Sequence, residues 1–517
     1  MRQWSVRATR REFVAAVGAV AATPLAQTLQ SVMAEPDLAK AMNALRAAIP
    51  VAAADPERPT YHFHPPANWN NDPNGTLFYK GWHHLFYQLN PFAPTGGNQH
   101  WGHARSRDLI NWEHLPIAIG PSSDRGERAI FSGGAIVAAD GRPRIIYTSI
   151  GHPQPEQWMA IPEDDELVRW KKSERNPVLT AAAHGRLEVD QWRDPFLFSE
   201  RGATYMVCGG NTKVTRGGAG QVQLYRAANA DLTRWIHLGA VFQALERETY
   251  NIECPNLFKL DGKWVLIISP HRACEYYVGE LDLEARRFIP ETHGILDAGD
   301  AYASNISRDD RGRTLLWLWG RTRTPRDRGW NGVMAMPRVL SIAADGALRQ
   351  EVPAEFATLR GPLQTFADIS LAQGVRMLEE TAADVAEVEA EFVAKGVGTF
   401  GFELRPSSSD APSTTISIQR GTLAVGSARA YVGTAERYRI RLFLDKRCME
   451  VYVNDGAAAL YTALDGAPRS RVLAVFARGV QSEFGAAGGD RGAGVRLESL
   501  KVWRMSPASF SLDRFHL

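Results

Sequence analysis

Cysteine is scarce in this chain, which has only four in 517 residues. No two of them form a Cys-x-x-Cys pair, so the sequence has the spacing of neither a zinc site nor a dithiol redox centre. Their wide separation argues against a disulfide framework, and we expect free, buried thiols. The four are Cys208, Cys254, Cys274 and Cys448.

An excess of one charge is also lacking, because 59 basic side chains face 57 acidic ones. This balance argues against a nucleic-acid or anionic-membrane partner and fits an uncharged ligand. The apolar run Val14–Ala26 is too short for a stable membrane anchor. Given its length and 44% apolar content, the chain is expected to fold as two or three globular domains.

The N-terminus resembles an export signal. The pair Arg10–Arg11 precedes the small-residue, mostly apolar run Val14–Ala26, which is typical of twin-arginine signal peptides. We therefore predict a signal peptide in residues 1–34, cleaved at the end of that run or after Ala34, and a periplasmic or secreted mature protein. The alternative is a basic N-terminus followed by an ordinary helix.

A pattern of polar motif, apolar strand, glycine turn and apolar strand recurs five times. The turn glycines lie 60, 61, 60 and 50 residues apart, and a repeat of this length made of β-hairpins is typical of a β-propeller. We therefore predict a five-bladed β-propeller in residues 59–355. The hairpins are Thr76–Gln88, Ala135–Thr148, Phe196–Cys208, Asn256–Ile268 and Asn305–Leu318, with turn residues Gly81, Gly141, Gly202, Gly262 and Gly312.

The polar motifs before the hairpins carry the chemistry. Repetition places them at the same end of successive blades, around one mouth. Three of them contain a carboxylate, Asp72, Asp194 and Glu253, so the ring gathers three acids that are far apart in sequence. The motifs are Asn71–Gly75, Phe131–Gly134, Arg193–Pro195, Glu253–Pro255 and Tyr302–Ser304.

Beyond Pro353 the motif-plus-hairpin unit stops. Many short strands with regular turn signals indicate a β-sandwich in residues 356–517, with Asn454–Gly456 as one turn. Residues 35–58, before the propeller, are predicted to form a short helix, Leu38–Ala48, and a linker. The strands expected in the sandwich are Glu389–Leu404, Thr414–Ile418, Tyr438–Leu444, Cys448–Val453, Ala459–Thr462 and Val472–Ala477.

The acid trio suits the cleavage of a glycosidic bond. Hydrolysis with retention needs two carboxyl groups about 5–5.5 Å apart, one as nucleophile and one as acid/base. A third carboxylate can bind sugar hydroxyls and stabilise the positive charge that develops at the ring. Simpler interpretations exist for each group: Asp72 as a turn former, Arg193 and Asp194 as a structural ion pair, and Glu253 as a solvated loop acid.

The motifs resemble, in content and order, those of glycoside hydrolase family 32, which contains invertases, inulinases and levanases. Any one block is weak, since Asp-Pro-Asn-Gly alone is usually a turn, but the ordered set is specific and covers roughly residues 60–510. The matching blocks are Trp69–Gly75, Phe86–Pro91, Trp101–Ala104 with Ser106, Asp108–Leu109 and Trp112, Phe131–Gly133, Arg193–Pro195, Glu253–Pro255, Trp330–Arg338, Leu442–Lys446 and Glu450–Gly456.

The resemblance implies a five-bladed propeller followed by a β-sandwich, and it assigns roles residue by residue. Asp72 would be the nucleophile at the fructosyl anomeric carbon, Glu253 the acid/base, and Asp194 the group that holds two ring hydroxyls. The chain departs from the family at Asn70, usually apolar, and at Gly134, often serine. The fructose subsite would be lined by Asn71, Gln88, Trp101, Phe131, Ser132, Arg193, Tyr302 and Trp319.

This chemistry needs an ionised nucleophile and a protonated acid/base. We expect negative neighbours and partial burial to raise the pKa of Glu253, and Arg193 to keep Asp194 ionised. The basic run Arg321–Arg328 is expected to be an exposed loop near the mouth, with substrate contact as its alternative role. No metal or cofactor is predicted, because six histidines lack the carboxylate and cysteine company of a zinc site: His62, His64, His83, His84, His100 and His103.

We therefore expect an exported, retaining β-fructofuranosidase that removes terminal fructosyl units from sucrose, inulin or levan with water as acceptor. Three alternatives stay open: a fructosyltransferase, a non-catalytic carbohydrate-binding protein on the same scaffold, and another furanosidase such as an arabinan-cleaving enzyme. The intact acid trio argues against a binding protein, and the Asp-Pro-Asn-Gly and Glu-Cys-Pro blocks favour fructose. We expect no nucleic-acid partner and no stable membrane anchor, and a monomer or homodimer.

Overall fold

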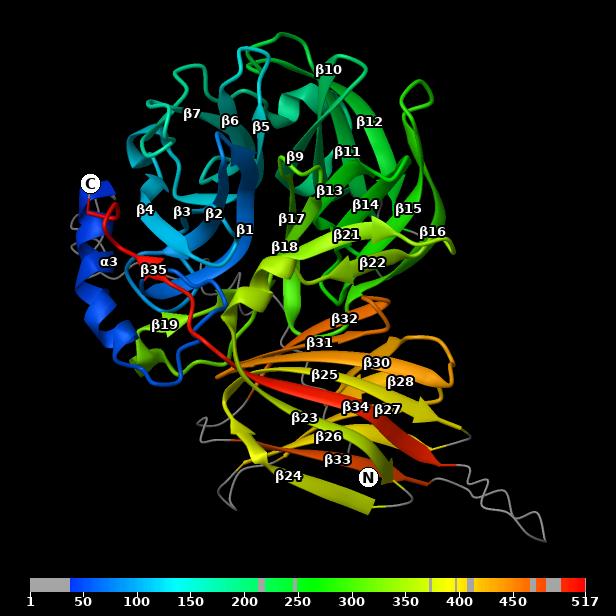
Figure 1. Cartoon of the computed structure of the whole chain (residues 1–517). Helices are drawn as coiled ribbons and strands as arrows, with labels where there is room; N and C mark the ends of the chain where they lie inside the picture. Colours follow the sequence, from blue (N-terminus) through cyan, green and yellow to red (C-terminus); the bar gives the residue numbers. More distant parts are fainter. Residues whose placement is uncertain are drawn as a thin grey trace, which may run out of the picture.

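The structure, a computed structural model, describes residues 38–212, 219–244, 249–371, 374–395, 398–406, 413–464, 471–479 and 494–516. The predicted signal peptide, residues 1–34, lies outside the described residues. Figure 1 shows two β-domains, a ring of sheets above and a layered pair of sheets below. No helix in the described part of the chain is long and apolar enough to cross a membrane.

Five sheets, one for each sequence repeat, make up the upper domain. The first strand of each sheet contacts the first strand of the next, and that of the fifth contacts that of the first, so the ring is closed. The first two sheets contain β1 Asn68–Tyr79, β2 Trp82–Asn90, β3 His100–Ser106 and β4 Trp112–Ile119, then β5 Ala129–Val137, β6 Pro143–Ile150, β7 Glu156–Pro162 and β8 Trp170–Lys172. The third and fourth contain β9 Val189–Glu200, β10 Ala203–Thr212, β11 Gly220–Ala227 and β12 Trp235–Gln243, then β13 Glu253–Leu260, β14 Lys263–Ser269, β15 Cys274–Asp282 and β16 Arg287–Asp297. The fifth contains β17 Ala301–Arg308, β18 Thr314–Gly320, β20 Val333–Met334, β21 Arg338–Ile342 and β22 Leu348–Glu351.

The hairpin turns explain why the repeats fold as sheets. All five predicted turn glycines have positive φ, for example 80° at Gly81 and 84° at Gly262. Lys80 and Asp261, just before them, also have positive φ. Two successive residues of this kind match the twist of the flanking strands, and glycine adopts the conformation without a steric penalty.

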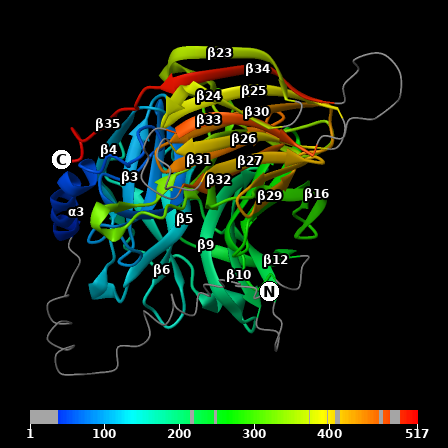
Figure 2. The ribbon, with the colours of Figure 1, turned by 90° about the horizontal axis from the view of Figure 1, so that it is seen from below.

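Segments from both ends of the chain pack on the first sheet. Helix α3, Leu38–Ala53, lies against β1 and β4, and it extends five residues beyond the predicted end at Ala48 because Ala52 is buried there. Strand β35, Phe510–Ser511, pairs in parallel with β4, and β19, Trp330–Asn331, with β1. The end of the predicted sandwich segment thus returns to the propeller, and Figures 1 and 2 show β35 beside α3.

The lower domain is a sandwich of two antiparallel sheets. The predicted single strand Glu389–Leu404 is wrong: it divides between β25, Val385–Ala394, and β26, Thr399–Pro406, which belong to opposite sheets. One sheet has the order β23 Arg360–Leu371, β34 Val495–Met505, β25 Val385–Ala394, β30 Arg437–Asp445, β31 Cys448–Val453 and β32 Ala458–Ala463. The other has the order β24 Gly374–Ala383, β33 Arg471–Arg478, β26 Thr399–Pro406, β27 Thr414–Gln419, β28 Thr422–Val425 and β29 Ala428–Tyr431.

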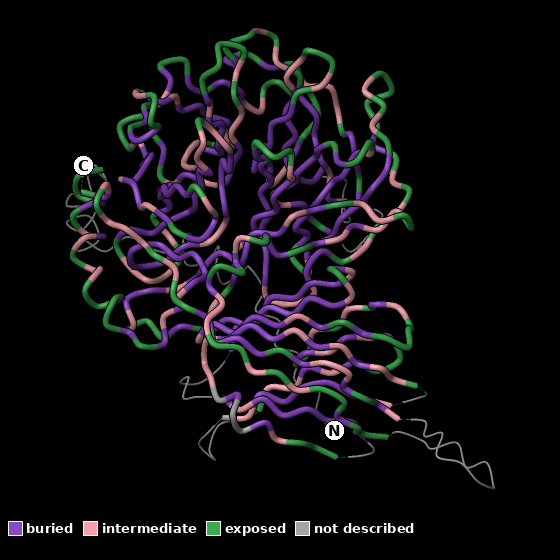
Figure 3. The backbone as a smooth tube through the Cα atoms, in the orientation of Figure 1, coloured by how far each residue is buried: buried purple, intermediate pink, exposed green. Residues whose placement is uncertain are grey.

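Apolar side chains between the sandwich sheets form a core of their own, which includes Phe392, Phe402 and Leu460. The propeller strands are buried in the same way, as the continuous purple segments of Figure 3 show. Each domain therefore has its own hydrophobic core. Four short 3-10 helices complete the described elements: η1 Ser123–Arg125, η2 Ala181–His184, η3 Arg326–Arg328 and η4 Ala354–Leu359.

Buried charges connect the two domains. Asp445 of the sandwich accepts hydrogen bonds from the backbone N–H groups of Thr60, Tyr61 and His62, at 2.7–2.9 Å. The His62 ring lies 3.0 Å from Asp445 and 3.2 Å from Glu450. Burial disfavours charge on His62, but hydrogen bonds to these two carboxylates outweigh it and raise the pKa of His62 to about 9.

Candidate active site

The five polar motifs lie at breaks in the regular pairing of the first strand of each sheet. A register shift of this kind, a β-bulge, turns side chains away from their regular alternation. All five bulges fall within or beside the sequence motifs. The direction of the motif side chains is therefore set by a local irregularity of the strand backbone. The shifts lie at Asn70–Pro73, Ile130–Gly133, Arg193–Phe196, Glu253–Asn256 and Tyr302–Ser304.

The backbone at three of these motifs is in the left-handed region, which is costly for residues other than glycine. The φ angles are 62° at Asp194, 46° at Cys254 and 52° at Ala303. Two of these conformations point N–H groups at a neighbouring blade. Asp194 donates to the Thr148 hydroxyl at 2.9 Å, and Cys254 donates to the Asp194 carboxylate at 3.1 Å. The motifs of Asp194 and Glu253 are thereby fixed relative to one another.

Asp72 lies in a neutral hydrogen-bond environment. It accepts from the Ser132 hydroxyl at 2.5 Å and from the Asn71 amide at 2.9 Å. Asp72 is partly exposed as a residue, but its carboxyl group is desolvated. This desolvation, together with the charges of Asp194 and Glu253, raises the pKa of Asp72 from 3.8 to about 7, although the hydrogen bond from Ser132 lowers it. This raised pKa differs from the ionised nucleophile that the sequence predicts, while the raised pKa expected for Glu253 stays a prediction.

Glu253 is surrounded by polar partners on both carboxylate oxygens. Arg193 Nη2 lies 2.5 Å from Oε1, the Tyr302 hydroxyl donates to Oε2 at 2.8 Å, and His271 Nδ1 lies 3.3 Å from the same oxygen. The Tyr302 hydroxyl also lies 3.0 Å from the Ser269 carbonyl oxygen and accepts from the His271 N–H at 3.0 Å. These contacts hold the carboxylate in one orientation.

Arg193 links two members of the trio. Besides its contact with Glu253, its Nε lies 3.6 Å from Asp194 Oδ2. Burial works against the charge, but the two carboxylates outweigh it and raise the pKa of Arg193 further. Asp72, by contrast, accepts hydrogen bonds from neutral donors alone in the part of the chain that the structure describes. The sequence predicts an ion pair of Arg193 with Asp194 alone. In the structure, the shorter contact of Arg193 is with Glu253.

Each of the remaining predicted subsite residues contacts another member of the predicted set. The Gln88 amide donates to the Ser132 hydroxyl at 2.9 Å, which extends the chain of hydrogen bonds that ends on Asp72. The Trp101 indole is fully buried and donates to the Phe131 carbonyl oxygen at 3.1 Å, so it supports that motif from behind. Trp319 is the cross-strand partner of Tyr302 in the fifth sheet.

Sequence reasoning missed three contributors to the site. Cys254 lies between two acids, with Sγ 3.7 Å from Asp72 and 3.8 Å from Asp194. Burial, then the charges of the trio, raise the pKa of the Cys254 thiol, which keeps it neutral. Its place in the Glu-Cys-Pro block was a usable signal, whereas His271 and Thr148 stand in no motif. All four cysteines are free and buried, as predicted.

The structure offers no metal site among the described residues, which contain no group of three or more histidine, cysteine, aspartate or glutamate side chains arranged to hold an ion. The six histidines considered above are all buried. Their contacts are with neighbouring rings, as for His103 stacked on Phe86, or with the domain junction, as for His62.

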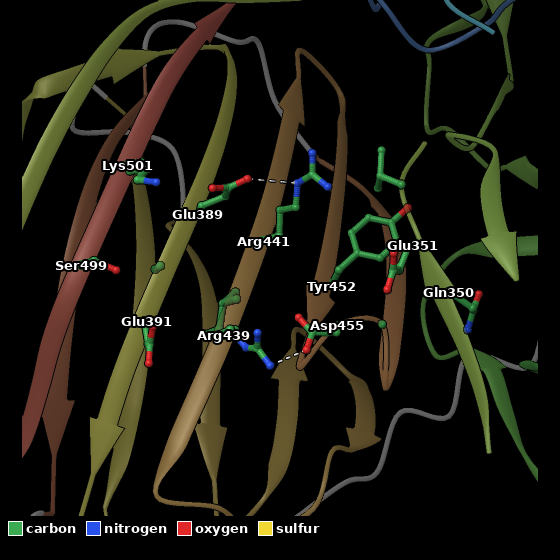
Figure 4. A pocket seen from close by; sticks show the side chains of 14 residues that line it. Gln350, Glu351, Glu389, Glu391, Arg439, Arg441, Tyr452, Asp455, Ser499 and Lys501 are labelled. Carbon is green, nitrogen blue, oxygen red and sulfur yellow. Dashed lines mark ion pairs between the residues drawn. The ribbon is translucent and has the colours of Figure 1, made fainter. Parts of the chain in front are cut away.

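A separate cavity of about 410 Å³ opens between the propeller and the sandwich. Figure 4 shows Arg441 pointing toward Glu389 and Arg439 toward Asp455 along its wall. The acid trio does not line it, so its mixed charges have no part in the candidate active site. Its polar wall comes from Gln350, Glu351, Glu389, Glu391, Arg439, Arg441, Tyr452, Asp455, Ser499 and Lys501.

Comparison with known proteins covers both domains. The family model of the glycosyl hydrolases family 32 N-terminal domain matches residues 62–352, and that of the family 32 C-terminal region matches residues 355–503. The sucrose-6-phosphate hydrolase of Bacillus subtilis is 28% identical over 449 residues, which cover 80% of this chain and 89% of that protein. The insoluble β-fructofuranosidase isoenzyme 2 of Oryza sativa subsp. indica is 33% identical over 389 residues, which cover 66% of this chain and 63% of that protein.

Solved structures agree on the fold. The crystal structure of fructan 1-exohydrolase IIa from Cichorium intybus superposes with a TM-score of 0.77 at 24% identity, covering 89% of this chain and 99% of that one. The predicted propeller followed by a β-sandwich is thereby confirmed. Because the two family models together span most of the sequence, this chain belongs to glycoside hydrolase family 32.

Proposed function

We propose that this glycoside hydrolase removes terminal β-D-fructofuranosyl units from sucrose or fructans, with retention of configuration and with water as acceptor. The observation that carries the proposal is the joining of three acids from three sheets into one cluster. Cys254 contacts Asp72 and Asp194, and Arg193 contacts Asp194 and Glu253. The names of the related enzymes, which refer to sucrose 6-phosphate, β-fructofuranosides and fructans, support the substrate class.

In the proposed double displacement, the Asp72 carboxylate attacks the anomeric carbon of the fructosyl unit. The bond from that carbon to the leaving oxygen breaks, and Glu253 gives its proton to that oxygen. A water molecule then gives a proton to Glu253 while its oxygen bonds to the anomeric carbon, which releases Asp72. Asp194 holds ring hydroxyls and stabilises the positive charge of each transition state.

The subsite residues have positioning roles in this proposal. Gln88 and Ser132 orient the nucleophile through the hydrogen bonds described above, and Asn71 does so from the other oxygen. Tyr302 and Arg193 orient the acid/base. The aromatic surfaces of Phe131 and Trp319 are partly exposed and are suited to the apolar face of a sugar, while Trp101 backs Phe131.

The first experiment is chromatography of the products formed from sucrose, inulin and levan, incubated separately with the purified protein. Free fructose released from one or more of them supports the hydrolase, and the preferred substrate defines its specificity. Glucose from sucrose without matching fructose would instead indicate the alternative, a fructosyltransferase. No release from any substrate would refute the proposal.

Variants of the acids test the roles. Asp72→Asn and Glu253→Gln should each lower turnover by at least about 10²–10⁴-fold while leaving the circular-dichroism spectrum unchanged. Reaction in dilute methanol tests retention, since a fructosyl-enzyme trapped by methanol yields methyl β-D-fructofuranoside. Formation of the α-anomer, or near-normal turnover in either variant, would contradict the mechanism.

We also propose that the protein is exported by residues 1–34 and acts without cofactor or metal as a monomer or homodimer. Support for export comes from the pair Arg10–Arg11 and the apolar run Val14–Ala26 that follows it. Mass spectrometry of the mature N-terminus and cell fractionation of an R10K/R11K variant test export, and light scattering measures the oligomeric state. An uncleaved protein retained in the cytoplasm, or activity abolished by a chelator, would contradict these statements.

A further inference from the structure

Arg321 lies exposed directly after β18, and its guanidinium is spread over two aromatic rings. Its Cζ lies 4.4 Å from the centre of the Tyr302 ring and 5.1 Å from that of Trp319. Those rings belong to cross-strand partners, so they form one continuous platform. Within the described part of the chain, no carboxylate pairs with this guanidinium. Stacking fixes the plane of the group and leaves the N–H donors along its edges available.

The platform connects Arg321 to the proposed acid/base, Glu253. The Tyr302 hydroxyl donates to Glu253, so Arg321 is separated from the proposed acid by the width of one tyrosine ring. An acid that protonates the leaving oxygen must face the departing sugar rather than the fructosyl ring. Arg321 is therefore next to the space that this departing sugar occupies.

The sandwich holds the backbone of Arg321 in place. The Tyr461 hydroxyl of β32 donates to the Arg321 carbonyl oxygen at 3.1 Å. Gly320, the preceding residue, packs so closely on Tyr461 that a Cβ there would lie 2.7 Å from its ring. The Tyr461 N–H is in turn bonded to Asp297 of the propeller at 3.0 Å. The second domain therefore fixes the point from which Arg321 extends.

We propose that Arg321 determines specificity for the departing sugar by donating hydrogen bonds to its hydroxyl groups, and that Tyr461 is the positioning residue for Arg321. This inference rests on the proposed function. It assigns a role in substrate discrimination to the sandwich, which contributes no acid to the trio. Because five N–H donors are held in one plane, the contact distinguishes a hydroxyl-bearing leaving group from one that lacks hydroxyls.

The experiment compares sucrose with methyl β-D-fructofuranoside, whose leaving group is methanol and offers no hydroxyl for Arg321 to bind. Arg321→Ala should lower kcat/KM for sucrose about 10–100-fold, the range for loss of hydrogen bonds to a charged group, and change it less than about twofold for the methyl glycoside. Arg321→Lys, which keeps the charge but loses the planar fork, should recover only part of the loss. Tyr461→Phe should raise KM for sucrose more than it lowers kcat.

Arg326→Ala, an exposed arginine on the same loop, is the matched control and should leave both substrates unaffected. Equal losses on both substrates in Arg321→Ala would overturn the inference, because they would place the effect on the shared fructosyl step. An unchanged rate on sucrose would also overturn it. Failure of the proposed function is a different result, since the unaltered protein would then cleave neither substrate.

Discussion

Asp72 differs from the other two acids of the trio because, among the described residues, its hydrogen-bond partners are all neutral. Arg193 contacts Asp194 and Glu253 instead. Burial and the two nearby carboxyls raise the pKa of Asp72 to about 7, so below pH 7 the trio holds a proton there. Double displacement also needs one proton on the trio, located on Glu253 when Asp72 attacks. The reactive form therefore requires this proton on Glu253 instead of on Asp72.

The need for a proton on the trio predicts that the pH profile of kcat/KM has a basic limb near pH 7. Above it, kcat/KM should fall about tenfold per pH unit, because the trio loses the proton that its acid must donate. Two substitutions move the limb in opposite directions. Ser132→Ala removes the hydroxyl that stabilises ionised Asp72 and should raise the apparent pKa by about one unit, equivalent to about 1.4 kcal/mol. Asp194→Asn removes a negative neighbour and should lower it.

The assay is the initial rate of fructose release from sucrose, well below KM, between pH 4 and 9.5. Ser307→Ala is the matched control, because Ser307 is also a buried serine of the propeller but bonds to the Trp317 indole, away from the trio. A rate that rises with pH through 7 would refute the reasoning, since the proton on Asp72 would then only block the nucleophile. Shifts of the same sign in Ser132→Ala and Asp194→Asn would refute it as well.

Three further predictions concern the domain junction and the acid/base. The pKa of His62 is about 9 in the folded protein against 6.5 in the unfolded chain, so protonated His62 stabilises the fold by about 3 kcal/mol below pH 6.5, and this stabilisation should be lost as pH rises through 9. The free energies of unfolding in urea of the intact protein and of His62→Gln should therefore converge by pH 10. A constant difference between them across this pH range would contradict the prediction. Asp445→Asn should lower the unfolding free energy by about 3–5 kcal/mol, because His62 loses one of its two buried carboxylate partners; a change below 1 kcal/mol in urea unfolding would argue against it. Tyr302→Phe should lower kcat about tenfold with little change in KM, as Glu253 loses a fixed donor; an effect on KM alone would assign Tyr302 to substrate binding.

The propeller could be predicted from the sequence because its information is local and repeated. Each unit carries its own turn glycine and its own alternation of strand residues, and repetition supplies the symmetry that brings distant motifs together. Asp194 and Cys254 contact one another although 60 residues separate them, one repeat apart along the chain. The repeats do not predict the left-handed backbone conformation of these two residues. That conformation is held by hydrogen bonds to neighbouring blades.

Other features depend on contacts that no local pattern records. Asp445 accepts a hydrogen bond from Thr60, which lies 385 residues away in the chain. The sequence around His62 therefore does not predict that two carboxylates contact its ring. The elevated pKa of Asp72 arises from desolvation in the assembled pocket, and the position of one arginine decides which carboxyl is left without a cation. The error at Glu389–Leu404 was avoidable, because Gly396 and Gly398 interrupt that run and are the usual signal of a turn.

The buried charges at the domain junction have a consequence for specificity as well as for stability. Arg338 Nη2 lies 2.7 Å from Asp297, Asp297 accepts from the Tyr461 N–H, and Tyr461 donates to the Arg321 carbonyl. An apolar contact would tolerate sliding between the domains, whereas paired charges fix one register, a role we infer here. Arg338→Met should therefore lower the ratio of sucrose to methyl β-D-fructofuranoside hydrolysis in addition to destabilising the protein. A destabilised variant with an unchanged ratio would show that the junction supports folding alone.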